Sequence, residues 1–401
     1  MLESNLKKDI VSLLKSSFSD AQKKGALPPH GIHSIDIEIT IERTKNPEHG
    51  DICSTLPLRL AKPLKMSPMA IAKALIEEIH PPGNTIKEIV PAAPGFINFH
   101  ISDEWYTDQV NEIIKSGHNF GNLSNGSGKT IQLEFGSNNP TGPLHVGHGR
   151  GVVFGSTLAN ILEAAGYRVH REYYINDYGS QIKMFGESIL ANYFTISGKP
   201  KEVPDGGYKG EYVGEIANKF REKFGDTILT LDEKESLKLS IDFGLTKMLA
   251  EIKEDLSKLN IHYDEWFSER TLFTSGQYKK TLEILESQKH TNSKDGALWF
   301  SSTKLGEEKD NVLVRKNGSP TYFASDIAYH HDKFANRKFD QVIDVWGADH
   351  QGHISRMKAA MGALDIDPEK LTILITQIVT FKVGSESVRL SKRSGNISLL
   401  S

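Results

Sequence analysis

Two histidines, His145 and His148, lie three residues apart with Gly147 between them. They follow an apolar segment, residues 130–135, that is typical of a strand, and a helix is expected to begin near Gly149. The N-terminus of a helix exposes unpaired N–H groups and partial positive charge, so it can hold the phosphates of a nucleotide. The glycine lets the backbone approach such a ligand closely. This spacing predicts a triphosphate site.

A second candidate group lies near the end of the chain, in the run Arg389-Leu390-Ser391-Lys392-Arg393. Its small and polar residues favour a loop, in which the basic side chains could close over phosphates as they leave. Either motif alone is weak evidence, because H-x-G-H arises by chance and basic loops are usually solvated surface. Their order on one chain, each beside a predicted strand, indicates nucleotidyl transfer, in which an α-phosphorus is attacked and pyrophosphate leaves.

Longer strings around these motifs point to one family. They read HGDICSTLPLRLAK at 49–62, SNNPTGPLHVGHGRG at 137–151, YFASDIAYHHDKF at 322–334 and VWGADHQGH at 345–353. In them the chain resembles the class I aminoacyl-tRNA synthetases, with HVGH and RLSKR as the two signature motifs, and specifically the arginyl-tRNA synthetases. The resemblance covers nearly the whole chain. It implies an arginine–tRNA ligase that activates L-arginine with ATP and passes it to tRNA(Arg), with Mg²⁺ arriving on ATP rather than in a protein cage.

The resemblance also implies roles for single residues. The catalytic residues would be His145 and His148, which stabilise the triphosphate, and Lys392, which stabilises the departing pyrophosphate. ATP binding is expected from His145, Gly147, His148, Gly347, Ser391, Lys392 and Arg393. Two alternatives stay open: a ligase for another amino acid on the same superfold, and a synthetase-like tRNA-binding protein without catalysis. The intact histidines and lysine argue against the second.

A guanidinium can be buried only against carboxylates that accept its fork of N–H donors. Asp326 lies four residues after Tyr322, so in a helix the carboxylate and the phenol share one face. By resemblance, both contact the side chain of arginine. The alternative is that Asp326 caps a helix, with Ser325 as a rival cap, and that Tyr322 lies in the core. His330 and His331, in the same expected helix among charged residues, are predicted to lie on the surface.

The backbone end of the amino acid has its own candidates, Glu134, Ser137 and Asn139, which surround the bend just before the two histidines. A carboxylate at the carboxyl end of a strand can bind the α-ammonium of the substrate, and an asparagine offers both a donor and an acceptor. The alternative for Glu134 is that it faces outward on an edge strand.

The run DHQGH at 349–353 has the spacing of metal ligands. A zinc site would need further Cys or His ligands, and the single cysteine, Cys53, lies far away in the sequence. We therefore expect no metal site of the protein's own. The strand predicted at 342–346 ends in Gly347, so the turn after it more naturally lines the ATP or arginine pocket, with Asp349 as an arginine-binding residue.

The first part of the chain, residues 1–117, is expected to form a small α/β domain. By resemblance, it is the extra N-terminal domain that contacts the outer corner of tRNA. Its pattern predicts an opening helix, a strand at 35–41, helices at 52–61 and 68–79, strands at 86–90 and 95–101, and a helix at 103–115. Ser67 and Ser102 are the expected N-caps of the last two helices. Residues 118–129, rich in Gly, Asn and Ser, are expected to be a linker.

Alternating strands and helices follow, which predicts an α/β fold with a Rossmann-like doubly wound parallel sheet. Its two halves, 130–194 and 296–401, are expected to be split by a connective insertion at 195–295. Strands are predicted at 130–135, 167–174, 298–300, 312–315, 342–346 and 372–375, and helices at 149–165, 178–194 and 354–364. A P-loop ending at Gly128 is excluded because Leu123 stands where its first glycine should be.

Composition limits the remaining possibilities. The 48 Lys and Arg residues face 51 Asp and Glu residues, so the net charge of −3 excludes a general basic coat and leaves local, shape-specific tRNA binding. The apolar residues near the N-terminus are interrupted by charges, which argues against a signal peptide or a membrane span and predicts a cytoplasmic protein, expected to be a monomer. Residues 394–401 are too few for the helical anticodon-binding domain of the family, so we expect weak binding and poor charging of tRNA(Arg).

Overall fold

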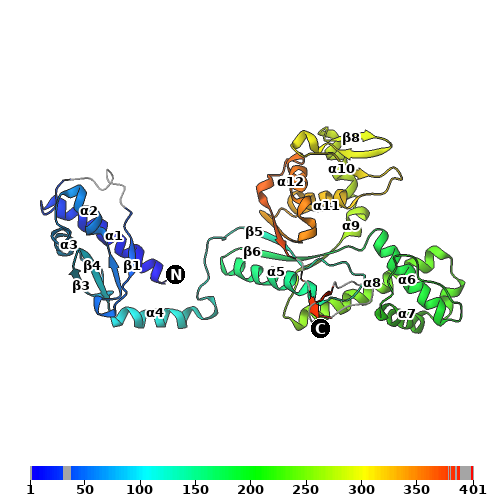
Figure 1. Cartoon of the computed structure of the whole chain (residues 1–401), viewed down its shortest axis with the longest axis horizontal. Helices are drawn as coiled ribbons and strands as arrows, with labels where there is room; N and C mark the ends of the chain where they lie inside the picture. Colours follow the sequence, from blue (N-terminus) through cyan, green and yellow to red (C-terminus); the bar gives the residue numbers. More distant parts are fainter. Residues whose placement is uncertain are drawn as a thin grey trace. The chain divides into compact units, whose positions relative to one another are not determined.

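The computed structural model describes residues 2–29, 38–377, 379, 381–383, 386–388 and 399–400. The chain divides into two compact units, Met1–Gly121 and Asn122–Ser401 (Figure 1). Ser391, Lys392 and Arg393 lie outside the described residues, as does the beginning of the strand predicted at 35–41. None of the described helices combines the length and apolarity needed to cross a lipid bilayer.

The first unit packs helices against a four-stranded antiparallel sheet in the order β1-β2-β4-β3. Helix α1 (Leu2–Lys23) buries Leu6, Ile10, Leu14 and Phe18, which recur every four residues and so share one face. The other elements are β1 (Ile41–Arg43), β2 (Ile52–Ser54), α2 (Leu56–Leu64), α3 (Pro68–Glu77), β3 (Ile86–Ala92), β4 (Phe96–Ile101) and α4 (Asp103–Ser116).

Two predicted helix starts in this unit are confirmed. The hydroxyl of Ser67 accepts a hydrogen bond from the backbone N–H of Ala70, and Ser102 caps α4 in the same way. The helix predicted at 52–61 is wrong in its first turn, because all three residues of β2 are buried and pair on both sides with neighbouring strands. Of the strand predicted at 35–41, residues 38–40 form no regular element, and β1 begins at Ile41.

The second unit is built on a five-stranded parallel sheet, which confirms the predicted doubly wound fold. Its strands are β5 (Thr130–Glu134), β6 (Arg168–Ile175), β7 (Glu265–Ser268), β11 (Gln341–Gly347) and β12 (Leu371–Thr376), in the order β12-β11-β5-β6-β7. The chain runs outward from β5 through β6 to β7, and then returns to β11 and β12 on the other side. The order of the strands therefore reverses between β5 and β11. In doubly wound sheets, ligands bind beyond the carboxyl ends of the strands at such a point.

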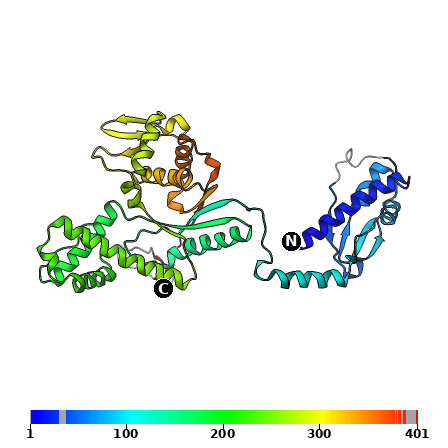
Figure 2. The same ribbon diagram turned by 180° about the vertical axis from the view of Figure 1, so that it is seen from behind.

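Each face of this sheet is covered by different helices (Figures 1 and 2). Leu133 and Phe135 pack with α5 (Val146–Ala164) and α8 (Glu233–Lys258) on one face. Because strand side chains alternate, Glu134 between them points to the opposite face, where α11 (Tyr322–His331) and α12 (Ile354–Ala363) lie. In β5, therefore, apolar side chains face α5 and α8, and the acidic Glu134 faces α11 and α12; we call this second side the polar face, although it also packs an apolar cluster.

The remaining elements surround this sheet. Helices α6 (Ser180–Ile196) and α7 (Glu211–Phe224) share an apolar core with part of α8. The range 195–295 also contains β7, which belongs to the main sheet, and the helices α9 (Glu269–Thr274) and α10 (Gln277–Ser287). The strands predicted near 298–300 and 312–315 are present as β9 (Ala297–Phe300) and β10 (Asn311–Val314).

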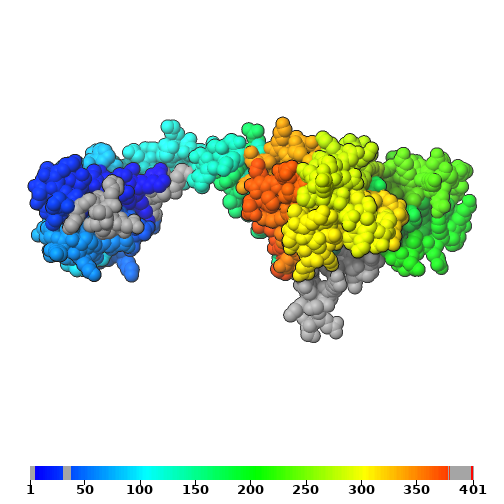
Figure 3. All heavy atoms as spheres, turned by 90° about the horizontal axis from the view of Figure 1, so that it is seen from above, coloured from blue at the N-terminus to red at the C-terminus, as the bar shows by residue number. Residues whose placement is uncertain are grey.

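Those two strands do not join the main sheet. Together with β8 (Thr291–Lys294) they form a separate three-stranded antiparallel sheet, whose residues give the yellow surface in Figure 3. A short hairpin of β13 (Phe381–Val383) and β14 (Glu386–Val388) follows the last strand of the main sheet.

The packing of α5 on the sheet can be tested at Gly155. A Cβ atom at this position would lie 2.2 Å from the ring of Phe135. We expect Gly155→Ala to lower the free energy of unfolding by about 1–3 kcal/mol, as overpacking does. The matched control is Gly151→Ala in the same helix, where a Cβ would meet no atom within 4 Å and helix propensity favours alanine. Urea unfolding that shifts equally in both variants would contradict this packing.

Candidate active site

The two histidines of the HVGH motif lie at the start of α5, which begins at Val146 rather than at Gly149. His145 is the N-cap residue in an extended conformation, and its backbone N–H donates to Nδ1 of His148 over 3.2 Å. The two imidazole rings stack with centroids 3.5 Å apart. Both rings are thus held in the first turn of a long helix, where its positive end can attract phosphate.

The chain returns to this helix start near its end. Leu399 pairs with His145 as an isolated bridge, and the backbone N–H of Leu400 donates to the carbonyl of Leu144 over 3.0 Å. A residue before the basic run also contacts this helix: the carbonyl of Gln377 accepts a hydrogen bond from a guanidinium N–H of Arg150 over 3.3 Å. Gln377, before the β13–β14 hairpin, and Leu399 and Leu400, after the basic run at 389–393, therefore contact the first turns of α5 or the residues just before it.

Glu134 ends β5, the middle strand of the five, and only 8% of its surface is exposed. The alternative of an outward residue on an edge strand is therefore wrong. Ser137 and Asn139 follow in the loop towards α5 and are half-buried. The hydroxyl of Ser137 accepts a hydrogen bond from the backbone N–H of Tyr174 over 3.0 Å, which ties this loop to β6.

Helix α11 carries Tyr322 and Asp326 on successive turns. Thr321 is its N-cap, because the threonine hydroxyl accepts from the N–H of Ala324, so the alternative of Asp326 as a helix cap is wrong. Tyr322 is 47% exposed and is not a core residue. Both side chains are thus available on one face at the beginning of the helix.

Glu269, the first residue of α9, is a further acidic residue near Asp326 that sequence reasoning missed. Burial raises the pKa of Glu269 to about 7, and the charge of Asp326 adds to the rise. Burial likewise raises the pKa of Asp326 to about 6, with Glu134 adding and His330 opposing. Among the described residues neither carboxyl group lies within ion-pair distance of a lysine or arginine, although the charges of Arg356, His330 and His350 act on Asp326. The only sequence signal was a glutamate directly after a short apolar strand, as at Glu134.

Gly347 and Asp349 lie at the carboxyl end of β11, next to the point where the sheet reverses direction. A Cβ on Gly347 would lie 2.5 Å from Oδ1 of Asp349, so a larger residue would make the Asp349 side chain turn away. The Asp349 side chain is 67% exposed, with its carboxylate 3.6 Å from Nε2 of His350. The DHQGH run forms a short 3-10 helix, Ala348–His353.

Four acidic residues lie side by side across the polar face of the sheet. Strand register places Asp344 opposite Glu134, Glu134 opposite Glu172, and Glu172 opposite Glu265. We call these four residues the carboxylate row. Asp344 and Glu172 have no exposed surface at all. Neighbouring carboxylates of this kind repel one another and are costly to bury unless cations pair with them.

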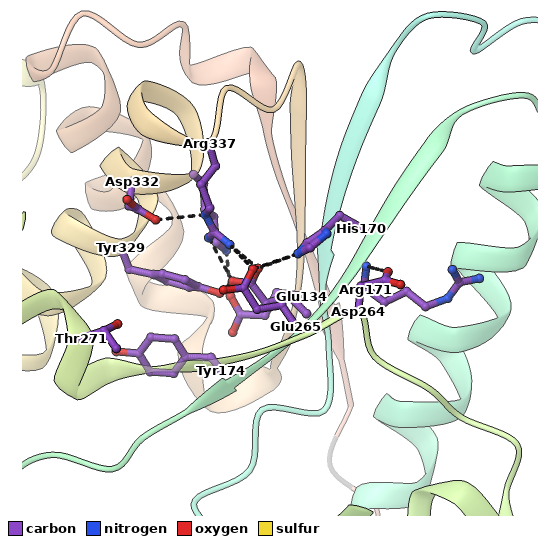
Figure 4. Close-up of polar contacts among 12 residues, drawn as sticks. Glu134, His170, Arg171, Tyr174, Asp264, Glu265, Thr271, Tyr329, Asp332 and Arg337 are labelled. Atoms are coloured by element: carbon purple, nitrogen blue, oxygen red, sulfur yellow. Dashed lines mark hydrogen bonds and ion pairs between the residues drawn. The ribbon is translucent and has the colours of Figure 1, made fainter. Parts of the chain in front are cut away.

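Those cations come mainly from one segment, α11 and the π-helical turn Asp332–Asn336 (η6) that follows it. Nζ of Lys333 donates to Glu134 and to Asp344, each over 2.8 Å. Further along, Arg337 pairs with Glu172 and with Glu265 (Figure 4). The end of this segment, and Arg337 directly after it, are therefore held to the sheet by ion pairs.

Two histidines also lie against carboxylates of the row. Nε2 of His330 lies 2.6 Å from Asp344, and His170 on β6 lies 3.1 Å from Glu265 and 3.4 Å from Glu172. The expectation that His330 and His331 are surface groups is wrong, since their exposures are 2% and 7%. His331 is buried because its ring pairs with the amide of Gln277 on α10.

The pKa values of the row follow from these contacts. Burial works to raise the pKa of Asp344, but Lys333 and His330 outweigh it and hold the pKa at about 2. In the same way, His170 and Arg337 hold the pKa of Glu172 at about 2 against its burial. Hydrogen bonds to Glu172 and Glu265 raise the pKa of His170 to about 9.

His170, Glu172 and Glu265 also have the mutual spacing of metal ligands, with donor atoms within 4.8 Å of one another. The guanidinium of Arg337 already engages both glutamates, and a raised pKa keeps a proton on the histidine. A metal ligand must be deprotonated, so we assign this cluster to the ion-pair network.

Comparisons with known proteins agree over nearly the whole chain. Residues 109–401 match the family described as tRNA synthetases class I (R), catalytic domain, and residues 5–101 match the arginyl tRNA synthetase N terminal domain. An arginine–tRNA ligase from Dehalococcoides mccartyi (strain CBDB1) is 47% identical over 98% of this chain and 69% of its own length, and one from Caldanaerobacter subterraneus subsp. tengcongensis is 44% identical with the same coverage. A Campylobacter jejuni structure, solved as a candidate arginyl-tRNA synthetase, has a TM-score of 0.67 and 36% identity, covering 75% of this chain and 65% of that one.

The charge network predicts a specific pH dependence of stability. The pKa of His170 is raised from 6.5 to about 9, so its contribution is fully present below about pH 6.5 and is lost as the pH rises through 9. Between these two pH values the parent protein should lose about 2 kcal/mol of its free energy of unfolding, and His170→Gln should not show this loss. The loss is smaller than a fully buried group would give, because the ring is partly exposed. Urea unfolding followed by tryptophan fluorescence measures it, with exposed His262→Gln as control. A variant that keeps the full alkaline loss would contradict the assignment.

Proposed function

The chain belongs to the arginyl-tRNA synthetase family of class I aminoacyl-tRNA synthetases, and we propose that it activates L-arginine with ATP at the crevice between β5 and β11 and transfers it to tRNA(Arg). The observation that carries this assignment is the pair of carboxyl groups at Asp326 and Glu269. Burial raises the pKa of both groups, the charge of Asp326 acts on Glu269, and that of Glu134 acts on Asp326; neither group forms an ion pair with a lysine or arginine among the described residues. A guanidinium that entered would supply the missing positive charge.

The arginine substrate would bind across this crevice. Its guanidinium would pair with Asp326 and Glu269, with the phenol of Tyr322 against its flat face. Its α-ammonium would meet Glu134 at the end of β5, and Ser137, Asn139 and Asp349 would line the same space. Carboxylates at both ends suit an amino acid that carries a cation at both ends, and they exclude residues with neutral side chains because the buried carboxyl pair would then stay unpaired.

ATP would place its phosphates at the N-terminus of α5. The carboxylate of arginine attacks the α-phosphorus, the bond to the β-phosphate oxygen breaks, and pyrophosphate leaves with the charge that develops. His145, Gly147 and His148 are positioned to stabilise that charge, and Gly347 to line the nucleotide pocket. We place Ser391, Lys392 and Arg393 over the departing pyrophosphate, a placement supported by the contacts of Gln377, earlier in the chain, and of Leu399, after the run, with the start of α5. Mg²⁺ is proposed to enter with ATP.

The second step passes the arginyl group to a ribose hydroxyl at the end of tRNA(Arg). We propose that residues 1–117 contact the outer corner of the tRNA, that 118–129 link this domain to the catalytic unit, and that 195–295 is the connective insertion between the two catalytic halves. The chain spans 69% of the length of the curated relatives it matches. We further propose that the protein works as a monomer in the cytoplasm.

Amino-acid-dependent ATP–pyrophosphate exchange across all twenty amino acids, with and without tRNA(Arg), tests the proposed first step. Arginine alone should support exchange. His148→Ala and Lys392→Ala should each slow it by roughly 10²–10³-fold, as the loss of one donor at developing charge does. The control is His118→Ala, at an exposed position in the other unit. Exchange at the parental rate in both variants would remove these residues from the mechanism.

Asp326→Asn separates arginine binding from ATP binding. Removal of one partner of a buried ion pair costs about 3–5 kcal/mol, so the free energy of arginine binding should weaken by that amount while the Kd for ATP stays unchanged. Because the pKa of Asp326 is raised to about 6, its charge opposes folding above that pH, and the variant should be no less stable at pH 8. Calorimetry of both ligands and urea unfolding decide the point. Unchanged arginine affinity would leave Asp326 without a role in recognition.

A further inference from the structure

Lys333 is a buried cation that the proposed reaction does not use. Its side chain has no exposed surface, and its ammonium bridges Glu134 on β5 and Asp344 on β11. It also lies 4.1 Å from the ring centroid of Tyr329, one turn earlier in the same segment. Burial opposes its charge, but Asp344 and Glu134 more than offset that effect, so the pKa of Lys333 lies above its usual value.

The position of this lysine links the two ends of the arginine site. Glu134, proposed for the α-ammonium, belongs to the sheet, whereas Asp326, proposed for the guanidinium, belongs to α11. Lys333 lies in the π-helical turn directly after α11, and such turns often occur where a helix is adapted to a function. The direct bond from Lys333 to Glu134 therefore joins the element that holds one end of the substrate to the element that holds the other.

We propose that Lys333 is a positioning residue that sets the length of the amino acid accepted, by fixing α11 against the carboxyl end of β5. This inference rests on the proposed function. Removal of the ammonium would leave Glu134 without its cation, next to Asp344 on the adjacent strand, whose remaining partner would be His330. The repulsion between the two carboxylates would then move the Glu134 carboxylate and release α11. The separation of the two substrate-binding carboxylates would then no longer be fixed.

The other end of the carboxylate row offers a matched control. Arg337 binds the same segment to the sheet, but its partners are Glu172 and Glu265 rather than a residue assigned to the substrate. Arg337→Lys keeps the charge and disturbs only that end. It should lower stability without altering the choice of substrate length.

The test compares kcat/KM in ATP–pyrophosphate exchange for L-arginine, for homoarginine with one more methylene, and for 2-amino-4-guanidinobutanoate with one fewer. A site of fixed length discriminates one methylene by roughly 10–200-fold. In Lys333→Met the preference for arginine over both analogues should fall by about tenfold or more, with a higher KM for arginine and an unchanged KM for ATP. Arg337→Lys should keep the parental preference.

Lys333→Met leaves two buried carboxylates without their shared cation and could fail to fold. Lys333→Met combined with Asp344→Asn removes one charge of each sign, keeps a partner for His330, and still cuts the tie to Glu134. Its length preference should also fall. Parental preference in a folded Lys333 variant would overturn the inference while leaving the function intact. A parent protein that does not exchange with arginine at all would overturn the proposed function and this inference with it.

Discussion

The pairing of buried carboxylates with cations is the interaction on which the catalytic unit depends. Parallel register brings Asp344, Glu134, Glu172 and Glu265 into one row on the polar face of the sheet. Such a row would repel itself and be strongly disfavoured by burial without compensation. Cations that follow one another along α11 and η6 provide that compensation, so the same contacts that make the row tolerable also fix the helix carrying Asp326. The polar face therefore supports α11 and also carries Glu134, one of the candidate binding residues.

The carboxylate row differs from the neighbouring carboxyl groups in its ion pairs and in the direction of its pKa shifts. Within the row, lysine, arginine and histidine side chains hold the pKa values of Asp344 and Glu172 at about 2. One turn earlier on α11, Asp326 has a raised pKa, as does Glu269 beside it. Carboxyl groups paired within the protein stabilise the fold, whereas Asp326 and Glu269 form no ion pair with a lysine or arginine among the described residues and are the proposed partners of the guanidinium. Glu134 belongs to both groups, because it is paired with Lys333 and is also proposed to meet the α-ammonium.

The phosphate end of the site depends on a different feature, the start of α5. The helix begins at Val146, so the stacked histidines lie at the end of the helix that carries partial positive charge. Residues on both sides of the basic run near the chain end contact this helix start. Two segments separated by more than two hundred positions in the sequence therefore meet at the start of α5, the helix that follows β5. The strand order reverses between β5 and β11, which is where this kind of fold favours ligand binding.

From the amino-acid sequence alone we could predict the doubly wound sheet, the caps at Ser67 and Ser102, and the family, because these depend on local periodicity, on hydrogen bonds within a few residues and on contiguous motifs. Asp326 lies inside such a motif and could be named as a candidate for the same reason. The folded chain was needed to reveal the burial of His330, the burial of Glu269 and the carboxylate row. Each depends on which strands pair in which register and on which helix covers which face, and an isolated acidic or basic residue in the sequence carries no sign of the partner it will meet.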